Sequence, residues 1–117
     1  MTTPAIHENV LSISKADNPD DKITINFDSL RRSVLVLRAI NHQLRQEMIG
    51  LLETEGKMTV TEIYIKLRLE QSVASQHLAI LRRASILNTQ REGKYIYYSL
   101  NKERIQEISE FIEDLAR

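Results

Sequence analysis

The sequence predicts a mainly α-helical fold that includes one small β-hairpin, and three features of the chain support this prediction. Apolar residues recur at spacings of three and four through five segments between residues 28 and 115, which is the period of amphipathic helices. Before the last of these segments, two runs of alternating residues flank Arg91-Glu92-Gly93-Lys94, where Gly93 supplies the positive φ that a tight hairpin turn needs. The length of 117 residues is that of one small domain.

The first 26 residues are expected to form an N-terminal arm that is partly flexible. Ser, Asn, Asp and Pro dominate up to about residue 22, and Asn18-Pro19-Asp20-Asp21 is typical of a turn or a break in the chain. Ile23, Ile25 and Phe27 alternate with polar residues and predict a short extended segment that packs on the body of the protein. Residues 27–117 are therefore the predicted folded domain.

Two helices are expected to open that domain. The first begins at Asp28 or Ser29, either of which can cap it, and its stretch SVLVLRAI is apolar around much of its circumference. Such a helix is buried on more than one side, as in a contact between subunits. The second helix spans about His42 to Thr54, and Gly56 is well placed to end it.

Two further helices, a hairpin and a last helix complete the prediction. The third helix is capped by Thr59 or Thr61 and ends near residue 67, and the fourth is capped by Gln71 or Ser72 and ends near residue 84. Strands follow at residues 86–91 and 94–100, and the last helix runs from about residue 102 to 115. This order is that of a winged helix-turn-helix with about five helices and a two-stranded wing, a module that reads duplex DNA.

The composition is that of a soluble protein without metal-binding thiols. No apolar run approaches the ~20 residues of a membrane span, so the expected location is the cytoplasm. The absence of cysteine excludes disulfides and thiolate metal sites. Lys and Arg equal Asp and Glu at 16 each, but the cations gather between residues 28 and 100 and the surplus acids lie at the two ends. Because salt screens charge beyond roughly 8–10 Å, the local surplus decides binding to phosphate.

The fourth helix is the candidate DNA reader, since the second helix of such a motif enters the major groove with its N-terminal residues against base edges. Glutamine pairs with adenine through two hydrogen bonds, serine adapts to several bases, and valine contacts the thymine methyl group. The alternative is that these side chains are ordinary caps and surface residues. The candidate base contacts are Gln71, Ser72, Val73, Ser75 and Gln76.

The turn of the hairpin adds two candidate contacts, Arg91 and Lys94, which flank it. Flexible cations at that place reach phosphate or a narrow minor groove, which attracts arginine. The alternative is a solvated polar turn. The tyrosines at positions 95, 97 and 98 are more simply explained as strand residues that cover the edge of the core.

No catalytic or metal site is expected. His77 and Ser75 are two residues apart on a helix and cannot face each other, so His77 is interpreted as a packed or hydrogen-bonded residue at the helix junction. The three histidines have no ligand-like spacing. The protein is therefore predicted to be neither an enzyme nor dependent on a cofactor.

The run LRLEQSVASQHLAILRRASIL, followed by REGKYIYYSL, resembles the ArsR/SmtB family of bacterial winged-helix repressors over about residues 30–116. The matching positions in the two motifs are Gln71, Ser72, Ser75, His77, Leu78, Leu81, Arg82, Gly93, Lys94 and Tyr98. The resemblance implies a homodimer that binds an operator and represses transcription. Residues 1–26 have no counterpart in the family pattern.

The resemblance also implies where the subunits meet, because the first and last helices form the dimer contact in that family. The apolar surplus of the same two segments here agrees with this. The expected interface consists of Leu30, Val34, Leu37, Ile105, Ile108, Phe111, Ile112 and Leu115.

One departure from the family pattern bears on regulation. The arsenic and cadmium sensors carry a Cys-x-Cys box on the third helix, and Thr59, Val60 and Thr61 stand in the corresponding place here. Residues 99–117 contain no histidine, which the zinc sensors use in their last helix. The sequence therefore predicts a repressor that does not sense metal. Its release from DNA stays open among a small molecule, a partner protein, modification and protein concentration alone, and the alternative function is a winged-helix module for protein–protein interaction.

Overall fold

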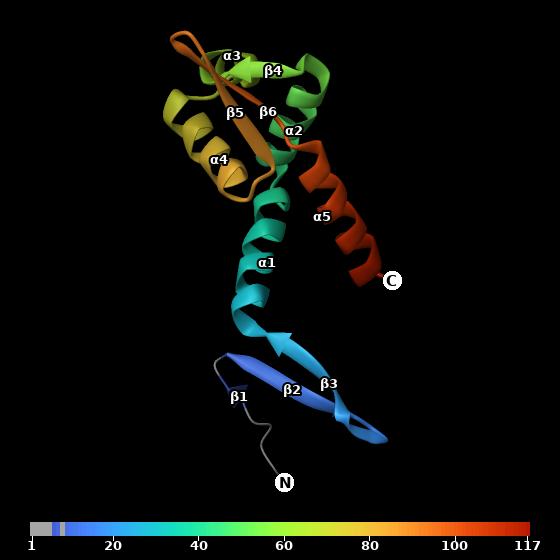
Figure 1. Cartoon of the computed structure of the whole chain (residues 1–117). Helices are drawn as coiled ribbons and strands as arrows, with labels where there is room; N and C mark the ends of the chain where they lie inside the picture. The colour runs from blue at the N-terminus through green and yellow to red at the C-terminus, as the bar shows by residue number, and fades with distance from the viewer. Residues whose placement is uncertain (1–5, 8) are drawn as a thin grey trace. The chain divides into compact units, whose positions relative to one another are not determined.

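The computed structural model describes residues 6, 7 and 9–117, which form two compact units divided between Leu37 and Arg38 (Figure 1). The helix α1 (Phe27–Ile40) runs across this division. The remaining part of the predicted N-terminal arm, residues 1–5 and 8, lies outside the described residues. Among those that are described, no helix is both long and apolar enough to cross a bilayer.

The N-terminal unit contains an antiparallel sheet where the sequence predicted mostly loose chain. Its strands are β1 (Ile6–His7), β2 (Val10–Lys15) and β3 (Asn18–Asn26), in that spatial order. The prediction of a loose arm up to about residue 22 is therefore wrong for this segment. The Asn18–Asp21 stretch does not break the chain, because the turn lies earlier, at residues 16–17.

The hairpin of β2 and β3 forms because its apolar residues match across the ladder. Leu11 pairs with Ile25 and Ile13 pairs with Ile23, so four apolar side chains share one face of the sheet. This match is hard to recognise from the sequence, since each strand contains only two of the four residues. The register shifts beside Lys15, and such a bulge tolerates the proline at position 19, which lacks an N–H donor.

The helix α1 begins one residue earlier than predicted, and its cap is Asn26 rather than Asp28 or Ser29. The backbone N–H of Ser29 donates to the Asn26 side-chain oxygen at 3.0 Å, which satisfies a free amide of the first turn. The last residue of β3 therefore also starts the helix.

The second unit contains the predicted helices and hairpin in the predicted order. Its elements are α2 (Gln43–Glu55), β4 (Lys57–Thr59), α3 (Val60–Leu67), α4 (Gln71–Arg83), β5 (Leu87–Glu92), β6 (Tyr95–Leu100) and α5 (Lys102–Leu115). Together with α1 they give five helices and a β-hairpin, which confirms the predicted fold class. The sheet gains a third strand that was not predicted, since β4 pairs with β6 in the order β4-β6-β5. Three residues are too few to show alternation in a sequence.

Local signals end and start most of these helices as expected. Gly56 closes α2 with φ 87°, and its N–H donates to the Leu52 carbonyl at 2.8 Å. Thr59 caps α3 in a reciprocal pair with Glu62. The predicted caps of α4 are wrong, because Gln71 is already helical and Glu70 occupies the cap position without a side-chain hydrogen bond.

The core of the second unit lies between the helices and the sheet. Its fully buried large side chains come from α2, α3, α4 and the start of the hairpin, and they are Met48, Leu52, Ile63, Leu78, Leu81 and Ile86. Ile108 of α5 joins this core with 6% of its surface exposed. It was expected at the dimer interface, but it is one position of the α5 stripe that the chain itself already covers.

Candidate nucleic-acid interface

The helix α4 presents most of its predicted reading residues to solvent. Buried Ala74, Leu78 and Leu81 fix which face of the helix points inward. Gln71, Ser72, Ser75 and Gln76 are all exposed, while Val73 is half-buried. Four of the five candidate side chains are therefore free to meet a base edge, and Val73 is the least accessible of the set.

A tight turn sets α4 at an angle to α3. Arg68 ends α3 in the left-handed conformation with φ 57° and ψ 46°. The N–H of Leu69 donates to the Tyr64 carbonyl at 2.9 Å, which satisfies one of the last free carbonyls of α3. The chain restarts as a helix at Gln71, so the N-terminus of α4 follows this turn directly.

The hairpin turn lies at the same end of the unit as the N-terminus of α4, because α4 runs away from that end and β5 returns to it (Figure 1). Gly93 has φ 63°, as the predicted tight turn requires. Arg91 donates from Nε to the Gly93 carbonyl at 3.1 Å, and the Lys94 ammonium lies 5.3 Å from the centre of the Tyr95 ring. Both predicted wing cations are exposed and held close to the turn.

One contact that joins the wing to the neighbouring strand was not found from the sequence. The Lys57 ammonium of β4 donates to the Glu92 carboxylate of β5 at 2.7 Å and lies 4.8 Å from the centre of the Tyr97 ring. The bond to Glu92 raises the pKa of Lys57. This pair is not recognisable from the sequence, because 35 residues separate its members and only the sheet β4-β6-β5 brings them together.

A buried arginine of α2 links α1 and α4. Arg45, 8% exposed, donates from Nε to the Ala39 carbonyl at 2.7 Å and from Nη2 to the Arg38 carbonyl at 3.0 Å, near the C-terminus of α1. Its Nη1 lies 3.1 Å from Nδ1 of His77 on α4. Arg45 is one of the cations between residues 28 and 100, and nothing in its sequence neighbourhood marks it as buried.

His77 is the packed, hydrogen-bonded histidine that the sequence analysis expected. An arginine can only donate, so Nδ1 of His77 accepts and the ring proton of the neutral form lies on Nε2. The His42 ring lies 4.8 Å away, centre to centre. Burial lowers the pKa of His77, and the charges of His42 and Arg45 lower it further. These effects all favour the neutral form of the imidazole.

Thr59, the first of the three positions that stand in place of the Cys-x-Cys box, has a structural role here. Thr59 accepts at Oγ1 from the Glu62 N–H at 3.2 Å, while the Glu62 carboxylate accepts from the Thr59 N–H at 3.0 Å. These bonds use both side chains to start α3. Among the described residues, no three His, Asp or Glu side chains gather in a ligand-like cluster.

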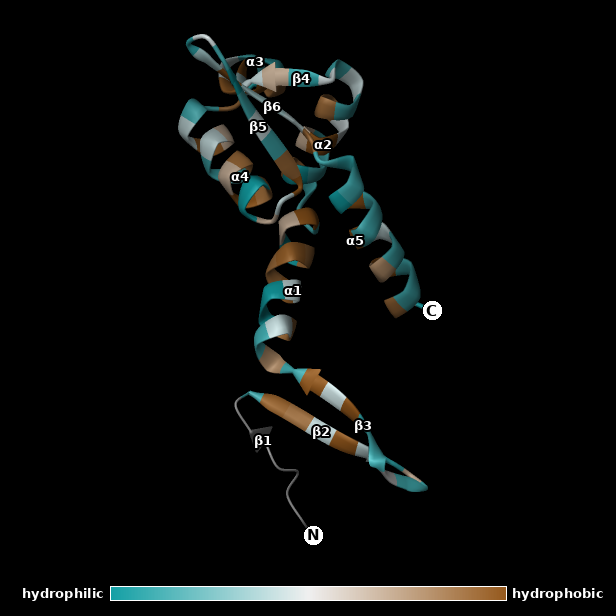
Figure 2. Cartoon of the chain, viewed as in Figure 1, coloured by the Kyte–Doolittle hydropathy of each residue, from teal (hydrophilic) through white to brown (hydrophobic). Residues whose placement is uncertain are grey.

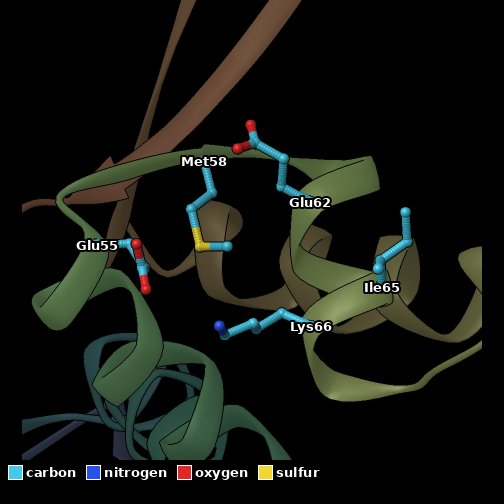
Figure 3. A pocket seen from close by; sticks show the side chains of 5 residues that line it. All are labelled: Glu55, Met58, Glu62, Ile65 and Lys66. Carbon is cyan, nitrogen blue, oxygen red and sulfur yellow. The ribbon is translucent and has the colours of Figure 1, made fainter.

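A pocket of about 320 Å³ opens beside α3 (Figure 3). Met58 lies in its middle, and Lys66 extends from α3 towards the end of α2. Its lining residues are Glu55, Met58, Glu62, Ile65 and Lys66. Since Glu62 already caps α3, the charged groups left for a ligand are one carboxylate and one ammonium.

The predicted dimer residues lie on two helices and remain largely uncovered. On α1, Leu30 is 50% exposed, and Val34 is exposed as well, while Leu37 is half-buried. On α5, the last turns bring Phe111, Ile112 and Leu115 to the surface, whereas Ile105 is half-buried. Apolar side chains therefore gather on the outside of α5, where Figure 2 shows brown patches near its C-terminal end.

Comparison with known proteins gives a consistent result. The family model described as bacterial regulatory protein, arsR family, matches residues 42–89, from the start of α2 into β5. The chain is 31% identical over 84 residues to the transcriptional activator HlyU of Vibrio cholerae, covering 72% of this chain and 77% of HlyU. It is also 31% identical over 91 residues to the transcriptional repressor PagR of Bacillus anthracis, covering 78% of this chain and 91% of PagR.

The three-dimensional comparison agrees. The crystal structure of PagR superposes with a TM-score of 0.58 at 31% identity and covers 76% of this chain and 98% of PagR. Almost all of PagR therefore has an equivalent here, whereas about a quarter of this chain has none in PagR.

Proposed function

We propose a specific role for this chain, which belongs to the arsR family of bacterial regulatory proteins and is a DNA-binding transcriptional regulator. It acts as a cytoplasmic homodimer that represses transcription from a specific operator. The exposed polar face of α4, at the same end of the unit as the basic wing turn, is the observation that best supports this role. Each reading helix would enter a major groove, and a two-fold axis would place two half-sites about 34–36 Å apart.

In this proposal the candidate residues of α4 and those of the wing have different roles. The side chains of Gln71, Ser72, Ser75 and Gln76 contact base edges and select the sequence, and Val73 adds an apolar contact at the edge of that surface. Arg91 and Lys94 neutralise phosphate or enter a minor groove, which adds affinity for every sequence. No catalytic role is proposed, since the side chains at this surface are suited to hydrogen bonding with DNA.

The reading surface is tested by fluorescence anisotropy with a duplex from the chain's own upstream region. A combined Ser75→Ala and Gln76→Ala change should weaken specific binding by about 10- to 100-fold, because one bidentate base contact accounts for about 1–3 kcal/mol. Binding to unrelated duplexes should stay as it was. Gln106→Ala, an exposed glutamine on α5, is the matched control. Unchanged specific affinity in the double variant would remove α4 from the role of reader.

A substitution in the wing should change DNA affinity in a different way in the same assay. Arg91→Ala should weaken binding to all sequences alike and make the dependence on salt less steep, because fewer counterions are released. Lys102→Ala removes a cation from α5 and serves as the control. A loss confined to the operator sequence would instead make Arg91 a base-reading residue.

The homodimer would form through the exposed apolar side chains of α1 and α5. Their charges are complementary, since α1 carries Arg31, Arg32 and Arg38 and α5 is rich in glutamate. Changing Phe111 and Leu115 together to serine should shift the chain from dimer to monomer in sedimentation velocity, while Gln106→Ser with Glu110→Ser should not. A dimer that survives the first pair of changes would place the interface elsewhere.

Metal independence and repression are the remaining parts of the proposal. Thr59 and Glu62 are engaged with each other at the start of α3, which supports release by something other than a metal at that place. Operator affinity should therefore be the same with and without a chelator. A reporter fused to the upstream region should rise in output when the gene for this chain is removed, and a fall would indicate activation.

A further inference from the structure

The hairpin of β2 and β3 has one apolar and one polar face. The pairs Leu11–Ile25 and Ile13–Ile23 occupy the first face, while Ser12 pairs with Thr24 on the other. The hydrophobic residues appear as brown segments along both strands (Figure 2). Ile13 is 43% exposed and Ile23 is 47% exposed, so water reaches the apolar face. A sheet with this pattern typically packs its apolar face against another layer of protein.

The hairpin has no core of its own to stabilise it. Of the residues between Asn9 and Leu37 whose burial is described, none is buried. An isolated hairpin is marginally stable in water and needs a further layer against its apolar face. The strands are nevertheless paired along most of their length, from Val10–Asn26 to Ser14–Lys22.

The hairpin is hydrogen-bonded to the start of α1. The Phe27 N–H donates to the Asn9 carbonyl at 2.7 Å, and Asn26 caps the helix. The Asn9 side-chain amide also lies 3.4 Å from the Asp28 carboxylate. Sheet and helix are therefore one continuous body, and a partner that binds α1 also meets the hairpin.

The charges of this body suit a second copy of itself. Between residues 9 and 37 there are four cations and four acids, so two copies do not repel each other. At the turn end of the hairpin, Asp17, Asp20 and Asp21 lie with Lys15 and Lys22, which leaves a net charge of −1, and Lys15 pairs with Asp21. At the start of α1, Arg31 and Arg32 lie with Asp28, which leaves a net charge of +1, and Arg31 pairs with Asp28. In a contact related by a two-fold axis the same patch occurs on both subunits, so acidic and basic ends can pair twice.

We propose that the apolar face of the β2–β3 hairpin docks on the same unit of a second copy of this chain, as an arm that extends the dimer contact of α1. The inference rests on the proposed homodimer and adds a contact to it. It also accounts for a hairpin that has one apolar face, buries none of its described residues and is hydrogen-bonded to the start of α1.

The test compares the two faces of the same two strands in the full-length chain. One variant combines Ile13→Asn with Ile23→Asn, and its control combines Ser12→Asn with Thr24→Asn. Both place asparagine at a cross-strand pair, so the residue type at the altered positions is the same in the two variants. Sedimentation velocity gives the dimer dissociation constant, and amide hydrogen exchange reports on residues 10–26.

The apolar-face variant should raise the dimer dissociation constant by about 100-fold or more, while the control stays within about threefold. Hairpin amides of the unaltered chain should be protected at concentrations where it is a dimer and lose protection on dilution in step with dissociation. Circular dichroism of both variants checks that residues 38–117 remain folded.

Each other result has a distinct meaning. If the unaltered chain is a monomer at all concentrations, the proposed homodimer fails and the arm contact fails with it. If a dimer forms but both variants dissociate alike, only the arm contact is overturned. Hairpin protection that does not change on dilution would show that the face is covered by its own chain, which also overturns the inference.

Discussion

Between Asn9 and Leu37 the chain forms paired strands and a helix without burying any residue whose burial is described, whereas Arg38–Arg117 encloses a core of completely covered side chains. Both units have regular hydrogen bonding, so secondary structure alone does not distinguish them. The difference teaches that a pattern of apolar residues has two uses. In the second unit it fills the interior of one chain, and in the first it leaves an apolar surface exposed to solvent.

The largest expected effect tests this contrast directly. Leu78→Ala should reduce the free energy of unfolding by about 3 kcal/mol, because it opens a cavity at a side chain with no exposed surface. Leu30→Ala on α1 is the counterpart in the first unit, where half of the side chain is exposed. Urea unfolding at low and high protein concentration measures both.

The two substitutions should respond differently to concentration. The loss caused by Leu78→Ala should be the same at either concentration, since the contact lies within one chain. The loss caused by Leu30→Ala should appear mainly where the protein is dimeric. If Leu30→Ala lowers the free energy of unfolding equally at both concentrations, the two units do not differ in this way.

A smaller effect is expected at the polar part of the second core. Arg45→Met keeps the length of the side chain but leaves the Ala39 and Arg38 carbonyls and Nδ1 of His77 without a donor. The free energy of unfolding should fall by about 1–3 kcal/mol. Arg83→Met, an exposed residue near the end of α4, should have little effect. Thermal unfolding of both variants gives the comparison, and equal losses would mean that the Arg45 network adds nothing.

The effect of pH on the free energy of unfolding should be smaller than that of Arg45→Met, because His77 is only half-buried. The pKa of His77 is lower in the folded chain than its unfolded value of about 6.5. As the pH falls below that value, the unfolded chain therefore binds a proton at His77 before the folded chain does. Stability should therefore be complete above that pH and decline as the pH falls from there towards the folded pKa. His77→Gln keeps an acceptor for Arg45 and should reduce this decline. A steeper decline in the variant would reverse the assigned sign.

The smallest effect is expected at the wing. Lys57→Met removes the ion pair with Glu92, whose side chains are largely exposed, and exposed pairs stabilise folding little. Any difference from the unaltered chain in thermal unfolding should vanish at about 1 M NaCl, where the Debye length is about 3 Å. A difference that persists in high salt would assign the stabilisation to the contact with Tyr97.

Much of the second unit could be predicted because its signals are local. The Gly56 stop, the stripe of Ala74, Leu78 and Leu81, and the turn at Gly93 each depend on residues a few positions apart. The exposure of Ser75 and Gln76 follows from the same stripe, since a helix that buries one face shows the other. The candidate reading face was therefore recognisable in advance, apart from the half-burial of Val73.

The errors lie where a residue depends on partners far away in the sequence. Ile108 fits the apolar stripe of α5 as well as its neighbours do, but the chain covers it and leaves Phe111 exposed. Burial of this kind is decided by which elements pack together. Periodicity in one helix cannot separate a core position from an interface position.

The sequence by itself determined the order of helices and hairpin, the polar face of α4 and the absence of thiols, because these follow from composition and short-range spacing. Only the tertiary structure decided that Arg45 bonds to His77, that Lys57 meets Glu92, and that the N-terminal segment is an amphipathic hairpin fastened to α1. The two side-chain contacts join residues 32 and 35 positions apart, and nothing in a local window encodes which of many distant partners a side chain will meet.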